Sequence, residues 1–365
     1  KKETDNMLYS CSPGLGSTAR ASRASSDHEN VTVDIHCHVY TPAADDAVAD
    51  SEVMGPEDMF TFANQATRDV NRAQMETINS KLTSIEERLK DMDSMDIDIQ
   101  ALSPAPPQYY YNAEPELGLL SSQIINNRIA EIVSEYPDRF VGLGTVPMQE
   151  PRLAVTELER MINELGMRGV EICTNVAGEE LSADRFKNFF AKAEELDALI
   201  FMHPNGFSEG RRLADHYLIN VIGNPLDSTV AVSHLIFGGV LDDYPGLKIC
   251  VAHGGGFLSA YSGRMDHAHG ARKDCRRCIE HPPTTYLKRL YFDTVVFTHH
   301  QLEYLVNLYG ADHILLGTDY PYDMGMQDPV RFVESSTNLD QKQKVAIAGG
   351  NAAQLLKIGA GISHE

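Results

Sequence analysis

Four histidines and one aspartate stand at the ends of apolar segments of this sequence, in a pattern that is typical of a metal site. His36 and His38 are separated by one residue, and alternate residues of a β-strand point to the same face. Two imidazoles side by side inside a protein make a poor core because each needs a hydrogen-bond partner, but they bind a divalent metal ion well. Further apolar segments end in His203, His253 and Asp319.

The elements that must position these residues are predicted from short apolar segments that alternate with amphipathic ones. The continuous apolar character of the short segments suits parallel strands that are buried on both faces. We predict strands over residues 31–37, 98–102, 140–146, 169–173, 199–203, 248–253, 290–293 and 314–318. Among the amphipathic segments, we predict helices over residues 152–165, 302–309 and 123–136.

Eight repeats of strand and helix predict an α/β fold of the (β/α)₈ TIM-barrel type. In such a barrel the chemistry gathers at the carboxyl ends of the strands. The five polar residues are therefore expected to converge at one mouth: His36, His38, His203, His253 and Asp319. Any single histidine at a strand end is weak support, but five such groups are hard to explain as packing.

The chain is expected to form one barrel domain over residues 31–365, preceded by an irregular N-terminal arm over residues 1–30. The arm is rich in Ser, Gly and charged residues and has no hydrophobic period. Residues 43–90 are too long for a simple crossover after the first strand. We interpret them as an insertion over the barrel mouth, partly helical over residues 68–92.

The charge and the cysteine content exclude several classes of protein. The 31 Lys and Arg residues against 52 Asp and Glu residues give a net charge of −21, which would repel nucleic acids and anionic membranes. No run of 18 apolar residues is present, so no membrane span is expected. Six cysteines in 365 residues are too few for a disulfide scaffold and indicate free thiols in the cytoplasm.

Several motifs resemble those of the amidohydrolase superfamily. More narrowly, they are similar to the family of aminocarboxymuconate-semialdehyde decarboxylase and related metal-dependent aromatic-acid decarboxylases. The resemblance covers about residues 31 to 358. It is carried by Asp-Ile-His-Cys-His at 34–38, His203-Pro204, the segment 247–256 that ends in three glycines, Gly-Arg-Met-Asp at 263–266, Gly-Thr-Asp-Tyr-Pro at 317–321 and Gly-Asn-Ala-Ala at 350–353.

The resemblance implies a role for each of these residues. His253 would be the acid/base that works on a metal-bound water, and Asp319 is an alternative proton donor. Arg264 would hold a carboxylate of the substrate in the site of a neighbouring subunit, which implies a homodimer. The expected ligands of one divalent ion, zinc or manganese, are His36, His38, His203 and Asp319.

Two departures from the family pattern bear on the expected number of metal ions and on the expected substrate. Members with two metals use a carbamylated lysine at the end of strand four, but residues 169–173 contain no lysine, which favours one metal. The decarboxylase that gives the family its name has a substrate-binding arginine before the Met-Asp that precedes strand two. This chain has Glu76 near that place and Arg72 four residues away, so its substrate is expected to be a different carboxylic acid.

The function predicted from these residues is the non-oxidative decarboxylation of an aromatic or muconate-type carboxylic acid. The same groups would also serve a hydrolase or hydratase that acts on an ester, a lactone or a C–C bond next to a ketone, and this alternative stays open. A barrel without enzymatic activity is hard to reconcile with five ligating or titrating groups at strand ends. Release of CO₂ distinguishes the first two classes of enzyme.

Overall fold

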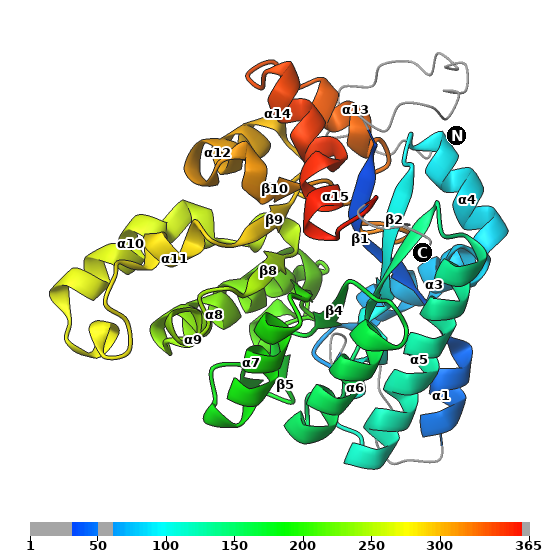
Figure 1. The fold of residues 1–365 in the computed structure, drawn as a ribbon, viewed down its shortest axis with the longest axis horizontal. Helices are drawn as coiled ribbons and strands as arrows, with labels where there is room; N and C mark the ends of the chain where they lie inside the picture. The colour runs from blue at the N-terminus through cyan, green and yellow to red at the C-terminus, as the bar shows by residue number, and fades with distance from the viewer. Residues whose placement is uncertain (1–30, 50–60, 360–365) are drawn as a thin grey trace, which may run out of the picture.

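The computed structural model describes residues 31–49 and 61–359, and eight parallel strands form its central sheet. Their order is β1-β2-β3-β4-β7-β8-β9-β10, with helices outside (Figure 1). All eight predicted strands and the predicted TIM barrel are confirmed. The bounds are β1 (Val33–Val39), β2 (Ile99–Pro104), β3 (Phe140–Gly144), β4 (Gly169–Ile172), β7 (Leu199–Met202), β8 (Lys248–Val251), β9 (Tyr291–Asp293) and β10 (Ile314–Leu315).

Five of the strands end earlier than the sequence indicates: β3, β4 and β7 by one or two residues, β8 by two and β10 by three. Strand β8 stops at Val251 and β10 stops at Leu315, although both had been expected to continue to the polar residues that follow. His253 and Asp319 have φ angles of 56° and 60°, a left-handed conformation that a regular strand does not contain. The backbone therefore departs from regular strand conformation at these two residues, which turns their side chains towards the mouth.

Backbone hydrogen bonds between the first strand and the segment after the last one close the barrel. The amide of Ile35 donates to the carbonyl of Leu316 at 2.9 Å, and the amide of His38 donates to the carbonyl of Tyr320 at 2.9 Å. Cys37 forms an isolated parallel bridge with Tyr320. The segment that carries Asp319 is thus paired directly with the strand that carries the two adjacent histidines.

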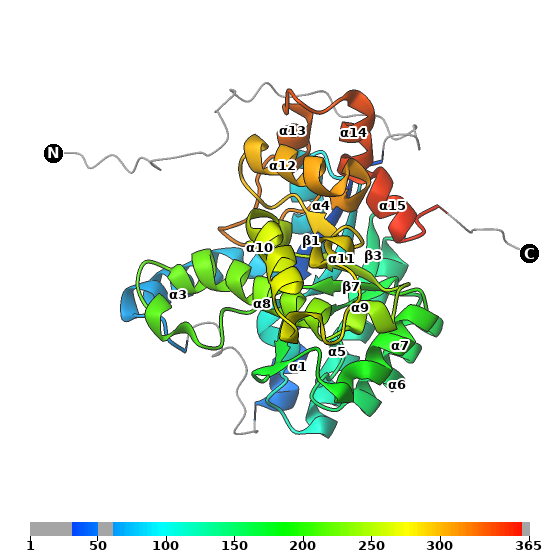
Figure 2. The same ribbon diagram turned by 90° about the vertical axis from the view of Figure 1, so that its left-hand side faces the viewer.

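Helices surround the barrel, with α12–α14 on one side and α5–α7 on the opposite side (Figures 1 and 2). The helices predicted from the sequence correspond to α6, α12 and α5. The bounds are α1 (Pro42–Val48), α3 (Gln65–Thr83), α4 (Ile85–Ser94), α5 (Pro115–Glu135), α6 (Pro151–Asn163), α7 (Lys187–Glu195), α8 (Asn224–Phe237), α9 (Val240–Asp243), α10 (Leu258–Ala271), α11 (Pro283–Leu287), α12 (His299–Tyr309), α13 (Pro329–Glu334), α14 (Gln341–Val345) and α15 (Asn351–Leu355).

Other features of the chain were not expected or lie outside the description. The short hairpin β5 (Asn175–Val176) and β6 (Glu179–Glu180) follows β4 and was not predicted. The expected N-terminal arm lies outside the described residues, as do residues 50–60 of the expected insertion. No helix in the described ranges has the length and apolar character that crossing a membrane requires.

A fully buried arginine ties helix α4 to the first strand of the barrel. Arg88 donates through Nη1 to Oε1 of Gln100 at 3.1 Å and through Nη2 to the carbonyl of His38. Its guanidinium also lies 4.8 Å from the centre of the Tyr320 ring. Gln100 in turn donates to Asp34 at 2.9 Å. The side chain of Gln100 therefore connects the buried guanidinium of Arg88 to a buried carboxylate by two hydrogen bonds.

We predict that Arg88→Met lowers the free energy of unfolding by about 2–4 kcal/mol, because it leaves two buried acceptors without a donor while keeping most of the volume. Urea unfolding measures the change. The matched control is Arg128→Met, which removes an exposed contact with Glu131 on α5 and should cost less than about 0.5 kcal/mol. Equal losses in the two variants would contradict the importance of the buried network.

Candidate metal centre

The structure brings three histidines and one aspartate from three strand ends into one cluster. One ligand atom from each of His36, His38, His203 and Asp319 lies within 4.8 Å of the other three. Nε2 of His36 and Nε2 of His38 both lie 3.4 Å from Oδ1 of Asp319. The centre of the His203 ring is 4.9 Å from the centres of both other rings. The alternation along β1 therefore presents both imidazoles to one point, as predicted.

Hydrogen bonds orient the two histidines of β1. Nδ1 of His36 lies 2.6 Å from Oδ2 of Asp293, and Nδ1 of His38 lies 3.0 Å from the carbonyl oxygen of Pro104. Both partners are acceptors, so each Nδ1 carries the proton. The lone pair of each imidazole is then on Nε2, the atom that faces the other ligands.

The histidine nitrogens that face the centre of the cluster have no hydrogen-bond partner within the described residues. Nε2 of His36, Nε2 of His38 and both ring nitrogens of His203 are buried without a hydrogen-bond partner. Unpaired buried polar atoms are costly, and one such nitrogen from each of the three rings lies within 4.8 Å of the others. Imidazole nitrogens and a carboxylate suit zinc or manganese, so the residues present fit a divalent metal ion.

The charges of the cluster also favour a cation. Burial disfavours the charge of Asp319, but His36 and the other histidines outweigh that effect and hold the pKa of Asp319 well below its usual range. Burial opposes protonation of His36 as well, yet the carboxylates of Asp319 and Asp293 raise its pKa. Burial and nearby His38 lower the pKa of His203. The carboxylates around His36 therefore favour a positive charge in the cluster, which a divalent ion would supply.

His253 stands beside this cluster on a turn that needs glycine. Its Nε2 lies 3.6 Å from Oδ2 of Asp319, and its ring centre lies 5.0 Å from that of His203. Gly254, Gly255 and Gly256 all have positive φ angles. A Cβ at Gly256 would come within 2.1 Å of a backbone oxygen, which no side chain tolerates. The predicted reason for the three glycines, a tight turn next to His253, agrees with this geometry.

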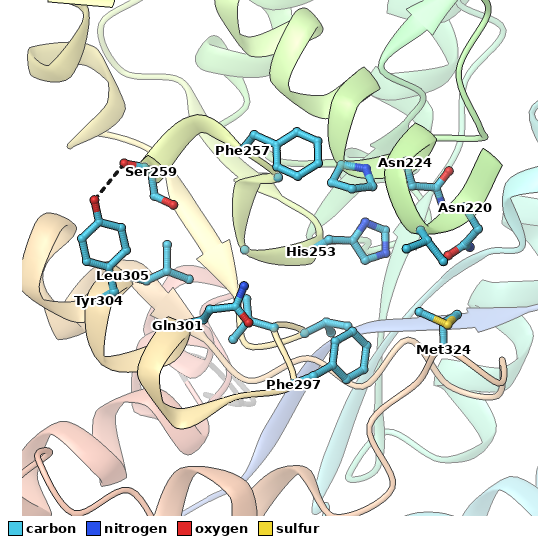
Figure 3. A pocket seen from close by; sticks show the side chains of 16 residues that line it. Asn220, Asn224, His253, Phe257, Ser259, Phe297, Gln301, Tyr304, Leu305 and Met324 are labelled. Atoms are coloured by element: carbon cyan, nitrogen blue, oxygen red, sulfur yellow. Dashed lines mark hydrogen bonds between the residues drawn. The ribbon is translucent and has the colours of Figure 1, made fainter. Parts of the chain in front are cut away.

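His253 also lines a cavity of about 320 Å³ (Figure 3). Its side chain is 15 % exposed, whereas those of His36 and His38 are fully buried. The ring of His253 lies between amide side chains and apolar side chains in the cavity (Figure 3). The cavity is lined, among others, by Asn220, Asn224, Gln301, Phe257, Phe297 and Met324.

The sequence analysis missed two buried acids beside the cluster. Asp293 bonds to His36, as described above, and Glu171 lies with Oε2 3.6 Å from Nδ1 of His38. Tyr109 donates to Oε1 of Glu171 at 2.5 Å, and burial raises the pKa of Glu171. Both acids stand at or near the carboxyl end of a predicted strand, and that position was the available signal. Their partners could not be named, because the partners come from distant strands.

Arg264 is the one candidate that the structure leaves outside the cluster. It lies exposed on α10 and is absent from the lining of the cavity at His253. Asp266 bonds instead to Thr284, with distances of 2.9 Å to its amide and 2.7 Å to its hydroxyl. No hydrogen bond or ion pair of the Arg264 guanidinium is found within the described residues.

Comparison with known proteins agrees with this fold and cluster. The family model described as Amidohydrolase matches residues 33–358. The chain belongs to the amidohydrolase family. A 2-amino-3-carboxymuconate-6-semialdehyde decarboxylase of Dictyostelium discoideum is 36 % identical over 280 residues, which cover 76 % of this chain and 78 % of that protein. A gamma-resorcylate decarboxylase of Rhodococcus jostii is 26 % identical over 308 residues, which cover 77 % and 90 %.

A solved amidohydrolase-fold structure also superimposes closely. A 5-carboxyvanillate decarboxylase from Novosphingobium aromaticivorans gives a TM-score of 0.82 with 23 % identity, covering 94 % of this chain and 100 % of that one. That protein was crystallised with manganese and 4-hydroxy-3-methoxy-5-nitrobenzoic acid. At this identity the likeness shows that the two chains share a fold.

We predict that this amidohydrolase binds one divalent ion per chain and that His36→Ala abolishes binding, because a ligand and its orienting hydrogen bond are both lost. A structure with the ion should show His36, His38, His203 and Asp319 at about 2.0–2.3 Å from it. Metal analysis after dialysis measures the content. The control is His299→Ala, because His299 bonds to Phe332 and Ser335 away from the cluster. Full metal content in His36→Ala would refute the site.

Proposed function

We propose that this amidohydrolase is a metal-dependent, non-oxidative decarboxylase of an aromatic or muconate-type carboxylic acid. The observation that carries the proposal is the position of His253, which contacts the metal-facing aspartate and lines a cavity large enough for a small acid. The activities named for the two relatives support it, since both remove a carboxylate from an unsaturated or aromatic carbon skeleton.

The metal would be held by the residues whose ligand atoms lie together: His36, His38, His203 and Asp319. A bound divalent ion lowers the pKa of water and polarises a carbonyl or phenol oxygen of a substrate. The chain itself supplies the orientation. Asp293 and the carbonyl of Pro104 fix the two imidazoles of β1, and this leaves Nε2 of each free for the ion.

His253 is proposed to move the proton. Decarboxylation breaks the bond between carbon and carboxylate, releases CO₂ and leaves an electron pair on the carbon, which must then gain one proton. His253 can deliver that proton because it alone among the five site residues lines the cavity. Asp319 also has a catalytic role here, because its Oδ2 faces Nε2 of His253 while its Oδ1 faces the metal ligands. It is also the alternative proton donor.

A hydrolase or hydratase remains the second candidate. Water activated next to His253 could attack an ester, a lactone or a C–C bond beside a ketone with the same residues. The decarboxylase is favoured by the relatives described above, and the lining of the cavity is equally compatible with either class. The product therefore decides between them.

The substrate proposed is a small acid with an uncharged, ring-like remainder. The cavity at His253 combines the aromatic side chains of Phe257 and Phe297 with the amides of Asn220 and Gln301. His253 is the one titratable group with a basic side chain among its lining residues. The acid is repelled at long range by a protein of charge −21, so its carboxylate needs a local cation, which the metal or an arginine would provide.

We propose that Arg264 supplies such a cation to the site of a second copy, in a homodimer. Helices α10 and α11 extend away from the barrel (Figure 1), and Arg264 is exposed there. Large apolar side chains are exposed nearby: Tyr261 at 65 %, Val221 at 45 % and Tyr304 at 41 %. Tyr304 on α12 donates to the carbonyl of Ser259 at 3.1 Å and so contacts the first turn of α10. Arginine meets a carboxylate with two hydrogen bonds.

We also propose that the enzyme works in the cytoplasm. The cysteines of the described ranges are unpaired, and three of them are buried: Cys37, Cys173 and Cys250. Free thiols are typical of a reducing compartment.

We expect the metal-loaded protein to release CO₂ from one or more members of a panel of hydroxylated benzoates and muconate-type acids. His253→Ala should keep the metal and lower turnover by about 10²- to 10⁴-fold, because a positioned acid/base is lost. Measuring CO₂ and metal content together tests both statements. Loss of the acid with addition of water and no CO₂ would establish a hydratase or hydrolase instead. Unchanged turnover in the variant would show that another group moves the proton.

We expect Arg264→Ala to raise KM for the acid without loss of metal, and two defective variants to complement each other. In a mixed dimer of Arg264→Ala and His36→Ala, one site contains both an intact metal cluster and an intact arginine from its partner. Mixing should therefore restore activity at substrate concentrations below KM. Arg272→Ala, which removes an exposed pair with Asp274, is the control for KM. A fully active monomer, or no gain on mixing, would disprove the role.

A further inference from the structure

One buried carboxylate contacts both functional parts of the site. Asp293 ends strand β9 and is fully buried. Its Oδ2 accepts from Nδ1 of His36 at 2.6 Å and from the amide of His253 at 2.9 Å. Its Oδ1 accepts from the amide of Gly254 at 2.8 Å and from that of Val295 at 3.1 Å. Four donors thus converge on two oxygens.

The contact with Nδ1 of His36 concerns the metal ligand. Because Asp293 accepts from Nδ1, His36 is held in the tautomer whose lone pair lies on Nε2. A carboxylate on the far nitrogen also fixes the plane of the ring and makes Nε2 a better ligand.

The contacts with the amides of His253 and Gly254 concern the turn that carries the acid/base. His253 has a φ of 56° and is followed by three glycines with positive φ angles, a conformation that costs free energy for a non-glycine residue. The amides of His253 and Gly254 both donate to Asp293, which offsets part of that cost. The direction of the His253 side chain therefore depends on the same carboxylate as the orientation of His36.

We propose that Asp293 is a positioning residue that couples the metal ligand His36 to the acid/base His253. It sets the tautomer of one imidazole and the backbone conformation of the other, although it touches neither the metal nor the substrate. The proposal takes its roles for His36 and His253 from the proposed function. It goes beyond that function by assigning to one residue the relative positions of the metal ligand and the acid/base.

The substitution Asp293→Asn distinguishes the proposed positioning role of Asp293 from a role in packing alone, because it keeps the volume of the side chain and changes its hydrogen bonds. All four groups that contact Asp293 are donors, and an asparagine has one acceptor oxygen and one donor nitrogen of nearly the same shape. If its nitrogen faces His36, the imidazole must present Nδ1 as an acceptor and moves its proton to Nε2, where the metal would bind. If its nitrogen faces Gly254 and Val295, the turn beside His253 loses the hydrogen bond of Gly254, and the segment after β9 loses that of Val295.

We expect Asp293→Asn to weaken metal binding about 10- to 100-fold and, at saturating metal, to lower kcat more than KM. Competitive titration of the metal-free protein with zinc gives the affinity without any substrate. The control is Asp227→Asn, which also removes a buried carboxylate, one that accepts from Thr174 and Asn175. Its metal affinity and kcat should stay within about twofold of the unsubstituted protein. Equal behaviour of the two variants in both measurements would overturn the proposal.

A second measurement needs no substitution and tests the proposal even if Asp293→Asn fails to fold. In the zinc-loaded protein labelled with ¹⁵N-histidine, we expect His36 to carry its proton on Nδ1 and to show a strongly shifted, hydrogen-bonded proton signal. A proton on Nε2 of His36 would refute the assignment. Both the zinc affinity and the tautomer are measured without turnover. They therefore test the role of Asp293 even if no acid of the panel is decarboxylated.

Discussion

The convergence of unpaired imidazoles on the carboxylate of Asp319 is the constraint on which the site depends. Two Nε2 atoms lie 3.4 Å from one of its oxygens and Nε2 of His253 lies 3.6 Å from the other. These groups are buried or nearly so, and nothing else within the described residues pairs with the histidine nitrogens that face the centre. Such an arrangement is stable when a cation occupies the centre, so the same geometry that is costly without a metal favours binding one.

The barrel meets this constraint through bonds between segments at opposite ends of the chain. Asp34 accepts from the amide and the hydroxyl of Thr318, at 3.0 and 2.7 Å, and from Gln100 at 2.9 Å. Arg88 adds a positive charge on the other side of Gln100. Asp34 of β1 therefore fixes the loop that carries Asp319 next to the two histidines. Positive φ angles at His253 and Asp319 then turn their side chains inward.

The net charge of the chain bears on how an anionic substrate would reach the site. The chain carries a net charge of −21, yet its proposed substrate is an anion. A strongly negative protein slows the approach of an acid, and a local cation at the site compensates for this at short range. The cavity at His253 contributes no arginine or lysine. A cation that meets the carboxylate would therefore come from outside this lining, and the proposed sources are the metal and Arg264 of a second copy.

The eight strands, the barrel and the convergence of five polar residues at its mouth could be predicted from the sequence, because these features depend on local patterns. Continuous apolar segments mark buried strands, alternation places His36 and His38 on one face, and parallel strands share one carboxyl end. Only the tertiary structure decided which groups touch. His36 and Asp293 are 257 residues apart, and the curvature and closure of the sheet determine that they meet. The cavity, the buried Glu171 and the distance of Arg264 from the site in one chain depend on packing between distant elements, for which local spacing carries no information.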